Sequence, residues 1–437
     1  MSLMRIEDLF HFEKGVLQSS KCTEGEFDFI TASSEWKTHN VYTHDCEALV
    51  FAAAASGSLG RTHYVNGKFI SSDLCFIITP KDPINFPIDL KFYHMIFNEF
   101  KNDIVKNTKA GTSKEAIGMK AFGNYKLPYF EISKQTETKI QFVNMQVSKV
   151  ELNSELTHQL NLIKQLRQAF LREAMQGKLC HAELVSASQE TGHDLLSKIK
   201  AEKAQLIADK KLKKEKELAP ISEDEIPFEI PEHWAWCRLG EICYTSGRIG
   251  WKGLSAAEYQ KSGPLFLSVH SLNYGDFVDY SKAFHITKER YDESPEIMLQ
   301  NEDILICKDG AGIGKLGIIR NLTEPATINS SLLLIRKNLI LNTKFVYYFF
   351  LSSHFQKIVQ ERIMGATTPH LYQRDIVGFP FALPPLNEQE QIVAKLEELM
   401  TYCDGLEESI KESQGYNEKL LQQVLREALQ GNTVLNE

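Results

Sequence analysis

Residues 384–431 read PPLNEQEQIVAKLEELMTYCDGLEESIKESQGYNEKLLQQVLREALQG. After the two prolines, apolar residues recur at alternating intervals of four and three: Ile392, Leu396, Leu399, Cys403, Leu406 and Ile410. That spacing is typical of the apolar seam of a helix that packs on another helix. A continuous helix here spans about 65 Å at roughly 1.5 Å per residue. Because it cannot bury its seam alone, we expect a partner helix of similar length.

The partner helix lies upstream in the same chain. Residues 171–177 read LREAMQG and nearly repeat LREALQG at 425–431, at an offset of 254 residues. The residues before 171 form their own seam: Ile140, Val143, Val147, Val150, Leu152, Leu156, Leu160, Ile163 and Phe170. A duplicated long helix indicates a duplicated protein.

The globular parts of the chain repeat as well. The segments GSLGR (57–61), ISSDL (70–74) and GTS (111–113) correspond to AGIGK (311–315), INSSL (328–332) and GAT (365–367). The last pair has the same offset of 254 residues as the helices. A unit of one globular domain plus one long helix therefore occurs twice, which suits a pseudo-two-fold target or a pair of identical partners.

The predicted fold class is α+β, with two pseudo-repeated mixed α/β domains and two long antiparallel helices that resemble a coiled coil. We assign residues 1–131 to the first domain and 132–180 to the central helix. Residues 181–230 form a polar, partly basic linker, because they end in the lysine-rich run 209–217 and an acidic, proline-marked boundary. Residues 231–385 form the second domain, and 386–437 the distal helix. Within the domains, the sequence predicts a turn at Val65–Lys68 and single helices over 90–104 and 345–363.

Composition sets broad limits on function. The 437 residues include 43% hydrophobic and 24% charged residues, with a net charge of −8, so a nucleic-acid partner must be met by local patches. The eight cysteines are scattered without metal-site spacing, which favours reduced thiols in a cytoplasmic protein. The amino-terminal residues do not resemble a signal peptide, and no apolar stretch reaches membrane-spanning length.

The sequence contains no complete motif for catalysis or cofactor binding. Gly312–Gly317 matches G-x-G-x-x-G after a strand, but Ile318–Pro325 is no helix, so the segment is interpreted as a turn between strands. Leu316 stands where a Walker A loop needs Ser or Thr. Single histidines such as His94 and His370 are interpreted as structural. The sequence predicts a binding protein with no catalytic residues, no metal and no cofactor.

Cations near the duplicated loops are the candidates for contact with DNA. These are Arg61 and Lys68 in the first domain, and Arg248, Lys252, Lys308, Lys315 and Arg320 in the second. Glycines let a backbone approach phosphate, lysines neutralise it, and arginine can pair with base edges. The alternative interpretation of each residue is a solvated loop cation.

With these residues in view, the chain resembles the specificity subunit of type I restriction–modification systems. The motifs of the resemblance are LPPLNEQ with Ile392 at 383–392, PEHW with Arg238-Leu239 at 231–239, GIGK at 312–315 with INSS at 328–331, and the paired LREA endings. The first domain departs from the pattern. Its helix begins after LPYFEISKQ (127–135), without the double proline and the Glu-Gln pair, and the amino terminus has no Pro-x-x-Trp.

The resemblance implies a non-catalytic subunit that reads a bipartite site on double-stranded DNA with two target-recognition domains. Its helices would set the spacer and dock two methyltransferase subunits, which bind S-adenosylmethionine and methylate adenines; a restriction subunit can join them. The seam residues Leu396, Leu399, Leu406, Leu156, Leu160 and Ile163 are then core. Two alternatives are a coiled-coil scaffold that reads no DNA, and a stand-alone DNA-modifying enzyme.

Overall fold

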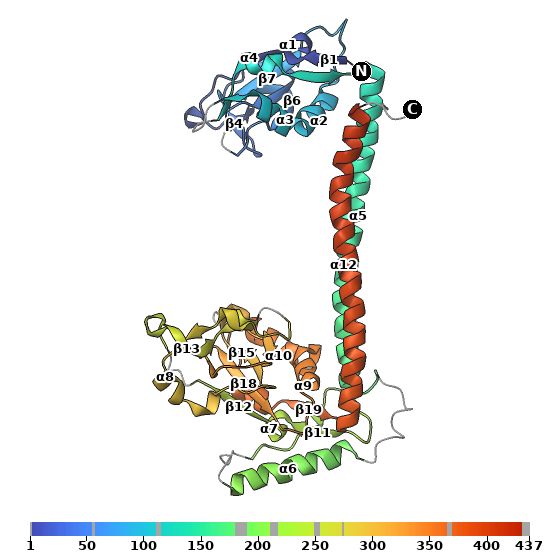
Figure 1. The fold of residues 1–437 in the computed structure, drawn as a ribbon. Coiled ribbons are helices and arrows are strands. Elements are labelled where there is room, and N and C mark those ends of the chain that lie inside the picture. Colours follow the sequence, from blue (N-terminus) through green and yellow to red (C-terminus); the bar gives the residue numbers. More distant parts are fainter. Residues whose placement is uncertain are drawn as a thin grey trace. The chain divides into compact units, whose positions relative to one another are not determined.

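The computed structural model describes residues 2–54, 57–110, 115–179, 190–209, 217–248, 254–272, 275–364 and 369–430. The contacts between residues divide the chain into two units. One comprises Met1–His158 and Ile410–Glu437, and the other comprises Gln159–Ser409. Two long helices, α5 (Ile132–Met175) and α12 (Leu386–Gln430), each contribute to both units (Figure 1).

The globular part of the first unit is a mixed sheet with short helices. Its strands are β1 (Ser2–Arg5), β2 (Phe10–Lys14), β3 (Phe27–Ile30), β4 (Lys37–His39), β5 (His44–Ala52), β6 (Thr62–Ser71), β7 (Cys75–Pro80), β8 (Lys109–Ala110), β9 (Ala116–Ile117) and β10 (Lys126–Tyr129). Its helices are α1 (Ile6–Leu9), α2 (Leu90–Glu99), α3 (Lys101–Thr108) and α4 (Met119–Asn124). The main sheet has the order β2-β7-β5-β6-β3-β4.

Strand β5 shows how the sequence builds this sheet. Leu49 and Phe51 belong to the core beneath α2, whereas Val50 points into a second buried cluster on the opposite face. Alternate residues of a strand point to opposite faces, so a continuous apolar run predicts a strand covered on both sides. Burying each such side chain stabilises the fold by about 1.5–3 kcal/mol.

The second unit contains a helix followed by a second globular domain. Its strands are β11 (Ala235–Arg238), β12 (Cys243–Gly247), β13 (Gln260–Leu267), β14 (Phe284–His285), β15 (Ile304–Cys307), β16 (Leu316–Ile318), β17 (Ala326–Ile328), β18 (Leu332–Lys337) and β19 (Pro380–Leu383). Its helices are α6 (Gly192–Ala208), α7 (Leu239–Ile242), α8 (Lys288–Asp292), α9 (Thr343–Leu351), α10 (Ser353–Met364) and α11 (Gln373–Val377).

The second domain repeats the strand order of the first. Its sheet β12-β18-β15-β16 corresponds to β2-β7-β5-β6, and the parallel pair β13·β17 corresponds to β3·β6. The long strand β6 is represented by two short strands, β16 and β17, so one sheet becomes two. Pro325, directly before β17, has no N–H to donate to a ladder, which is one reason for the interruption.

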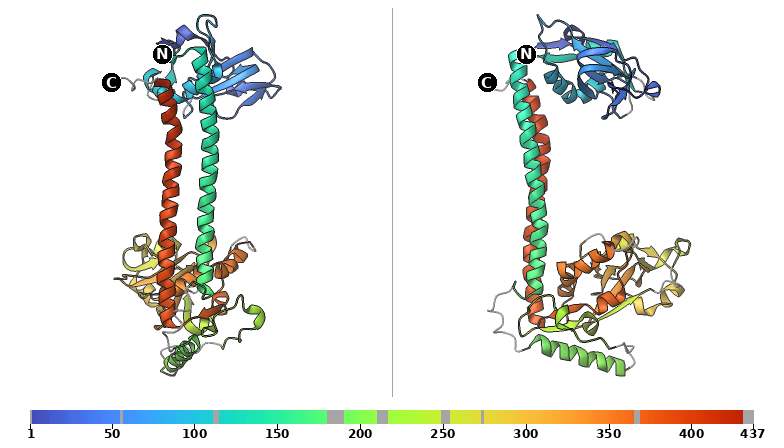
Figure 2. Two further views of the ribbon diagram at one scale, coloured as in Figure 1. Left: turned by 90° about the vertical axis from the view of Figure 1, so that its right-hand side faces the viewer. Right: turned by 180° about the vertical axis from the view of Figure 1, so that it is seen from behind.

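The two long helices pack antiparallel. In the second unit, Leu171 near the end of α5 shares a core with Leu396 near the start of α12. Arg167, one turn earlier in α5, donates to Asp404 Oδ1 (2.7 Å) and Glu407 Oε2 (3.2 Å), later in α12. Figure 2 shows these ends of the two helices side by side. The predicted fold class is therefore confirmed.

In the first unit, a buried asparagine joins the same two helices. Asn417, seven residues beyond the seam residue Ile410, is 6% exposed. Its Nδ2 donates to Lys149 O (3.2 Å) and to Asn153 Oδ1 (2.9 Å) on α5. A buried polar residue at a seam position favours one register of a helix pair over others.

The seam predicted for the amino-terminal half of α5 is wrong. Its apolar side chains are about half exposed or more: Ile140 53%, Val143 49%, Val147 54%, Val150 69% and Leu152 46%. Leu406 of α12 is also 45% exposed, whereas Leu156, Ile163 and Leu396 are buried as expected. Periodicity shows that a helix has an apolar face, but not whether the same chain covers that face.

Three local predictions are also wrong. The turn expected at Val65–Lys68 lies inside the continuous strand β6, where Gly67 takes a positive φ of 116° without ending the strand. The helix expected over 90–104 is broken into α2 and α3 at Phe100. The helix expected over 345–363 is likewise divided at Ser352. The repeat segments at 111–113 and 365–367 lie outside the described residues.

A buried glutamine connects each long helix to its globular domain. Gln389 Oε1 accepts from Asn342 N (3.0 Å), the amino-terminal cap of α9, and its Nε2 donates to Pro384 O (2.9 Å). Gln135 makes the same two bonds, with Asp89 N (2.8 Å), the cap of α2, and Phe130 O (2.7 Å). Both glutamines are 0% exposed and lie 254 residues apart.

The first domain thus keeps the glutamine of the Glu-Gln pair, which corrects the sequence interpretation. What it lacks is the glutamate. Glu388 Oε2 accepts from His233 Nε2 (2.8 Å) and Trp234 Nε1 (2.9 Å), and position 134 is lysine. The glutamate and the tryptophan that it binds are absent together from the first domain.

Candidate nucleic-acid interface

The two glycine turns have the same backbone hydrogen bonds. In the first domain, Gly60 N–H donates to Ala52 O, and Ala52 N–H donates to Arg61 O, both at 2.8 Å. The second domain repeats both bonds, again at 2.8 Å, between Cys307 and Gly314-Lys315. The glycine in each pair has a positive φ, 80° and 83°, which residues with a side chain rarely adopt. The duplication inferred from sequence is therefore present in the backbone.

The two candidate cations of the first domain lie apart. The Arg61 guanidinium is half-buried and donates from Nη1 to Ala32 O (3.1 Å). Lys68 is exposed on β6, with Nζ 4.9 Å from the ring centroid of Tyr42. Seven residues along an extended strand separate their Cα atoms by about 23 Å. Lys68 is free to meet a phosphate, whereas Arg61 supports the backbone of the β3–β4 connection.

In the second domain, Lys308 and Lys315 bracket the glycine turn between β15 and β16. The turn interpretation of Gly312–Gly317 is confirmed, because Ile304–Ile306 and Leu316–Ile318 pair as antiparallel strands. Lys308 Nζ lies 2.5 Å from Asp309 Oδ2, and its side chain is 16% exposed. Lys315 is exposed on the other side of the turn.

Two of the remaining candidates are engaged within the protein. Arg320 Nη1 donates to Asp276 Oδ2 (2.9 Å), and its side chain is 35% exposed. Arg248 is only 4% exposed; its Nε donates to Ile328 O (3.0 Å), and burial lowers its pKa. A guanidinium so enclosed stabilises the end of β12 and is not placed to meet DNA. Lys252 lies outside the described residues.

Sequence reasoning missed a cluster beside the turn of the second domain. His370, interpreted as structural, contacts Asp309 through Nδ1, and its ring centroid is 4.4 Å from that of Tyr372. The guanidinium carbons of Arg374 and Arg362 lie 4.6 and 5.5 Å from the Tyr372 ring centroid. Tyr372 is 42% exposed. The signal that could have found this cluster is the 254-residue offset, which aligns His370 and Tyr372 with Ala116 and Gly118.

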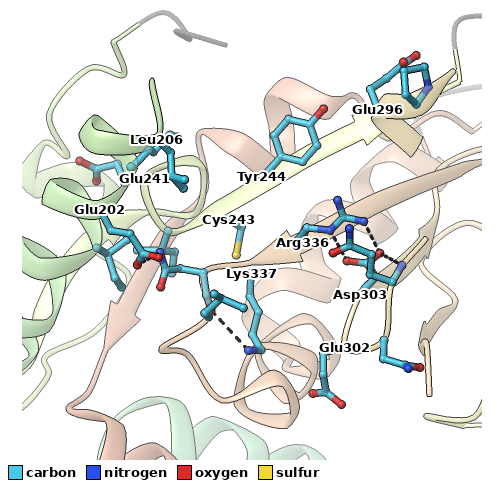
Figure 3. Close-up of a pocket in the computed structure, with 18 residues that line it drawn as sticks. Glu202, Leu206, Glu241, Cys243, Tyr244, Glu296, Glu302, Asp303, Arg336 and Lys337 are labelled. Atoms are coloured by element: carbon cyan, nitrogen blue, oxygen red, sulfur yellow. Dashed lines mark hydrogen bonds and ion pairs between the residues drawn. The ribbon is translucent and has the colours of Figure 1, made fainter. Parts of the chain in front are cut away.

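A cavity of about 660 Å³ lies elsewhere in the second unit, between α6 and the strands β12 and β18 (Figure 3). Its charged lining consists of Glu202, Glu241, Glu296, Glu302, Asp303, Lys203, Arg336 and Lys337. Figure 3 shows Arg336 against Asp303, whose two carboxylate oxygens accept from Nε and Nη2 at 2.7 Å each. Glu202 Oε2 accepts from Asn338 Nδ2 (2.9 Å). With five carboxylates and three cations, this cavity disfavours a phosphate backbone.

Among the residues that the structure describes, no group of three or more His, Cys, Asp or Glu side chains could hold a metal ion. Over the same residues, no helix is long and apolar enough to cross a membrane. The exposed groups at the glycine turns are cations, a histidine and an aromatic ring, which suit contacts with phosphates and base edges.

The fold defines an internally duplicated protein, in which each copy consists of a mixed α/β domain that leads into a long helix. The family model described as "Type I restriction modification DNA specificity domain" matches residues 1–162 and 231–413. The chain belongs to this family.

Individual relatives agree with this assignment. The specificity subunit of the type I restriction enzyme EcoAI from Escherichia coli is 30% identical over 255 residues, which are 56% of this chain and 41% of that protein. The matched stretch thus spans less than half the length of that curated relative. A solved HsdS subunit from Thermoanaerobacter tengcongensis shares the fold, with a TM-score of 0.56 and 15% identity over 99% of this chain and 97% of the other.

A second solved structure also shares the fold. It is described as "Structural basis underlying complex assembly and conformational transition of the type I R-M system". It has a TM-score of 0.57 and 16% identity, and the match covers 99% of this chain and 98% of the other. Helix α6 and residues 217–230 fall between the two segments matched by the family model.

Proposed function

We propose that this chain is the DNA sequence-specificity subunit of a type I restriction–modification complex. Residues 1–131 and 231–385 are its two recognition domains, and each reads one half of a bipartite site on double-stranded DNA. The observation that supports this most strongly is the repeated backbone with different side chains. Two domains with one scaffold and different surface residues suit two different half-sites on one duplex.

The contacts with DNA come from the exposed cations of both domains. We assign Lys68 in the first domain and Lys308, Lys315 and Arg320 in the second to contacts with DNA. Arg320 exchanges its carboxylate partner for a phosphate, which is the commoner ligand of such side chains at DNA interfaces. Arg61 supports this surface through Ala32, and Lys252 stays a prediction from sequence. Binding through phosphates weakens steeply as salt rises.

The long helices are the surface for two methyltransferase subunits. The exposed apolar side chains of α5, from Ile140 to Val150, support this assignment, because an exposed apolar stripe marks an interaction surface. The partners bind S-adenosylmethionine and supply the catalysis, and a restriction subunit joins the same complex. The chain itself has no catalytic role and works in the cytoplasm, where the DNA is.

Co-expression with a methyltransferase of the same system tests this proposal. We expect the two proteins to co-purify, and the complex to methylate adenines at a split motif with two defined halves around a fixed unspecific gap. The purified chain alone should transfer no methyl groups from S-adenosylmethionine. Methylation by the chain alone would contradict the proposal in favour of a stand-alone enzyme, and a stable complex without sequence preference would favour a scaffold.

A further inference from the structure

Beside each glycine turn lies a short segment, 116–118 in the first domain and 370–372 in the second. The two segments have the same backbone conformation and different side chains. Ile117 N–H donates to Ala53 O (2.7 Å), and Leu371 N–H donates to Lys308 O (2.8 Å), so the segments hold equivalent places. The next residues, Gly118 and Tyr372, precede α4 and α11 with φ and ψ of −77° and 144°, and of −78° and 144°. Position by position, the two segments can therefore be compared.

At four equivalent positions, the side chains of the second domain are larger and more polar than those of the first. The first domain has only small residues there: Ala53, Ala54, Ala116 and Gly118. The second domain has Lys308, Asp309, His370 and Tyr372, which we call the polar patch. A Cβ atom added at Gly118 would meet nothing within 4 Å, so the space directly beside this position is open in the first domain.

The polar patch is held in place by its own contacts. Asp309 accepts from Lys308 and contacts His370, and the guanidinium groups of Arg362 and Arg374 both lie over the ring of Tyr372. His370 and Tyr372 are 37% and 42% exposed, so their outer edges face solvent. Fixed side chains lose less conformational entropy when they bind than mobile ones.

The surroundings of the patch favour a duplex as its ligand. Arg374 is exposed beside Tyr372, and Lys315 is exposed on the same glycine turn as Lys308. Position 374 is a cation in both domains, because Lys120 is its equivalent, and both side chains are exposed. A cation common to both domains suits the DNA backbone, which both must meet. Residues that differ suit the bases, which differ between half-sites.

We propose that the polar patch makes sequence-specific contacts of the second domain with its half-site, and that the first domain reads its own half-site through other residues. The inference rests on the proposed function and deepens it. His370 and the Tyr372 hydroxyl can hydrogen-bond to base edges, and the Tyr372 ring can pack on a thymine methyl group. Arg374 and Lys120 contact phosphate and position the segments.

The test uses the full chain in complex with its methyltransferase subunits and sequences the methylated adenines. The double variant His370→Ala, Tyr372→Ala should lose discrimination at one or two positions of one half of the motif, by about tenfold or more. The half that the second domain reads is identified by exchanging residues 231–385. The control is Gly118→Ala in the first domain, which has open space and should leave both halves unchanged.

Three outcomes separate the two proposals. If the wild-type complex shows a split motif and the double variant keeps it unchanged, this inference is overturned and the proposed function stands. Equal loss of rate at all sequences would also overturn it, because that result places the patch on the phosphate backbone. A wild-type complex without a split motif would overturn the proposed function. If the double variant has a lower melting temperature than the wild type, the single variants Tyr372→Phe and His370→Gln replace it in the test. Each of them should alter the preference at one position of the motif.

Discussion

Two buried glutamines, Gln135 and Gln389, join the long helices to the domains through the same hydrogen bonds. Each glutamine accepts a hydrogen bond from the backbone N–H of a helix cap. It donates another to the carbonyl of the residue five positions before the glutamine itself. A side-chain amide suits this position because it offers both a donor and an acceptor. Leucine has a similar volume and offers neither.

Gln389→Leu should lower the free energy of unfolding of the second unit by about 2 kcal/mol, since it leaves Asn342 N and Pro384 O without these partners. Chemical denaturation measures the difference. The neighbouring Glu390 is exposed on α12, so Glu390→Ala should change stability by less than about 0.5 kcal/mol. Equal effects of the two substitutions would show that the glutamine does not tie α12 to the domain.

A second set of contacts, made by Arg238, holds the segment 219–225 against the second domain. Arg238, 7% exposed, donates to both carboxylate oxygens of Glu225 at 2.6 and 2.8 Å, and also to Ala219 O, Pro220 O and Gly378 O. Hydrogen bonds from Arg238, and after them those from Ser222, lower the pKa of Glu225 from 4.5 to about 2. A carboxylate whose pKa is depressed in the folded state stabilises the fold above its unfolded pKa.

The stability that Glu225 contributes should therefore be lost as the pH falls from 4.5 towards 2. At pH 7, Glu225→Gln should unfold at a lower denaturant concentration than the wild type. The difference between the two should shrink through that window and vanish below it. A difference that stays constant from pH 7 to pH 2 would mean that the charge of Glu225 is not what fixes the segment.

At the scale of elements, the helix pair shows what apolar spacing does and does not reveal. The spacing of α12 correctly predicted the buried residues Ile392, Leu396 and Cys403. The same kind of spacing in α5 predicted burial of Ile140 and Val150, which are 53% and 69% exposed. Burial of such an apolar face is favourable whether the surface that packs on it belongs to this chain or to a partner. Spacing alone therefore does not distinguish the two.

Polar replacement of this stripe should weaken the binding of a methyltransferase subunit while the chain stays folded. Val143→Ser with Val147→Ser removes apolar area that is already about half exposed, so thermal stability should change little. Co-purification of the methyltransferase should fall. Ser148 is exposed about 140° further around the helix from Val143, given roughly 100° per residue, so Ser148→Gln should leave binding unchanged. If the serine variant binds as the wild type does, the docking surface lies elsewhere.

At the scale of the whole molecule, the duplication could be predicted from the 254-residue offset, because identical backbone turns keep their glycines at fixed spacing. The division of β6 into β16 and β17 could not, since it depends on pairing between distant strands. The candidate site was only partly predictable. Sequence shows that Arg248 and Lys68 are cations, but burial and partners decide which of them meets DNA, and these arise from the fold.

The central claim is that two domains on one chain each read one half of a DNA site. Exchanging residues 1–131 for the first domain of another family member, and sequencing the adenines methylated by the reconstituted complex, tests it most directly. We predict that one half of the motif changes, while the other half and the length of the gap stay as they were, because residues 132–437 are retained. A change in both halves, or a motif unchanged by the exchange, would contradict the account.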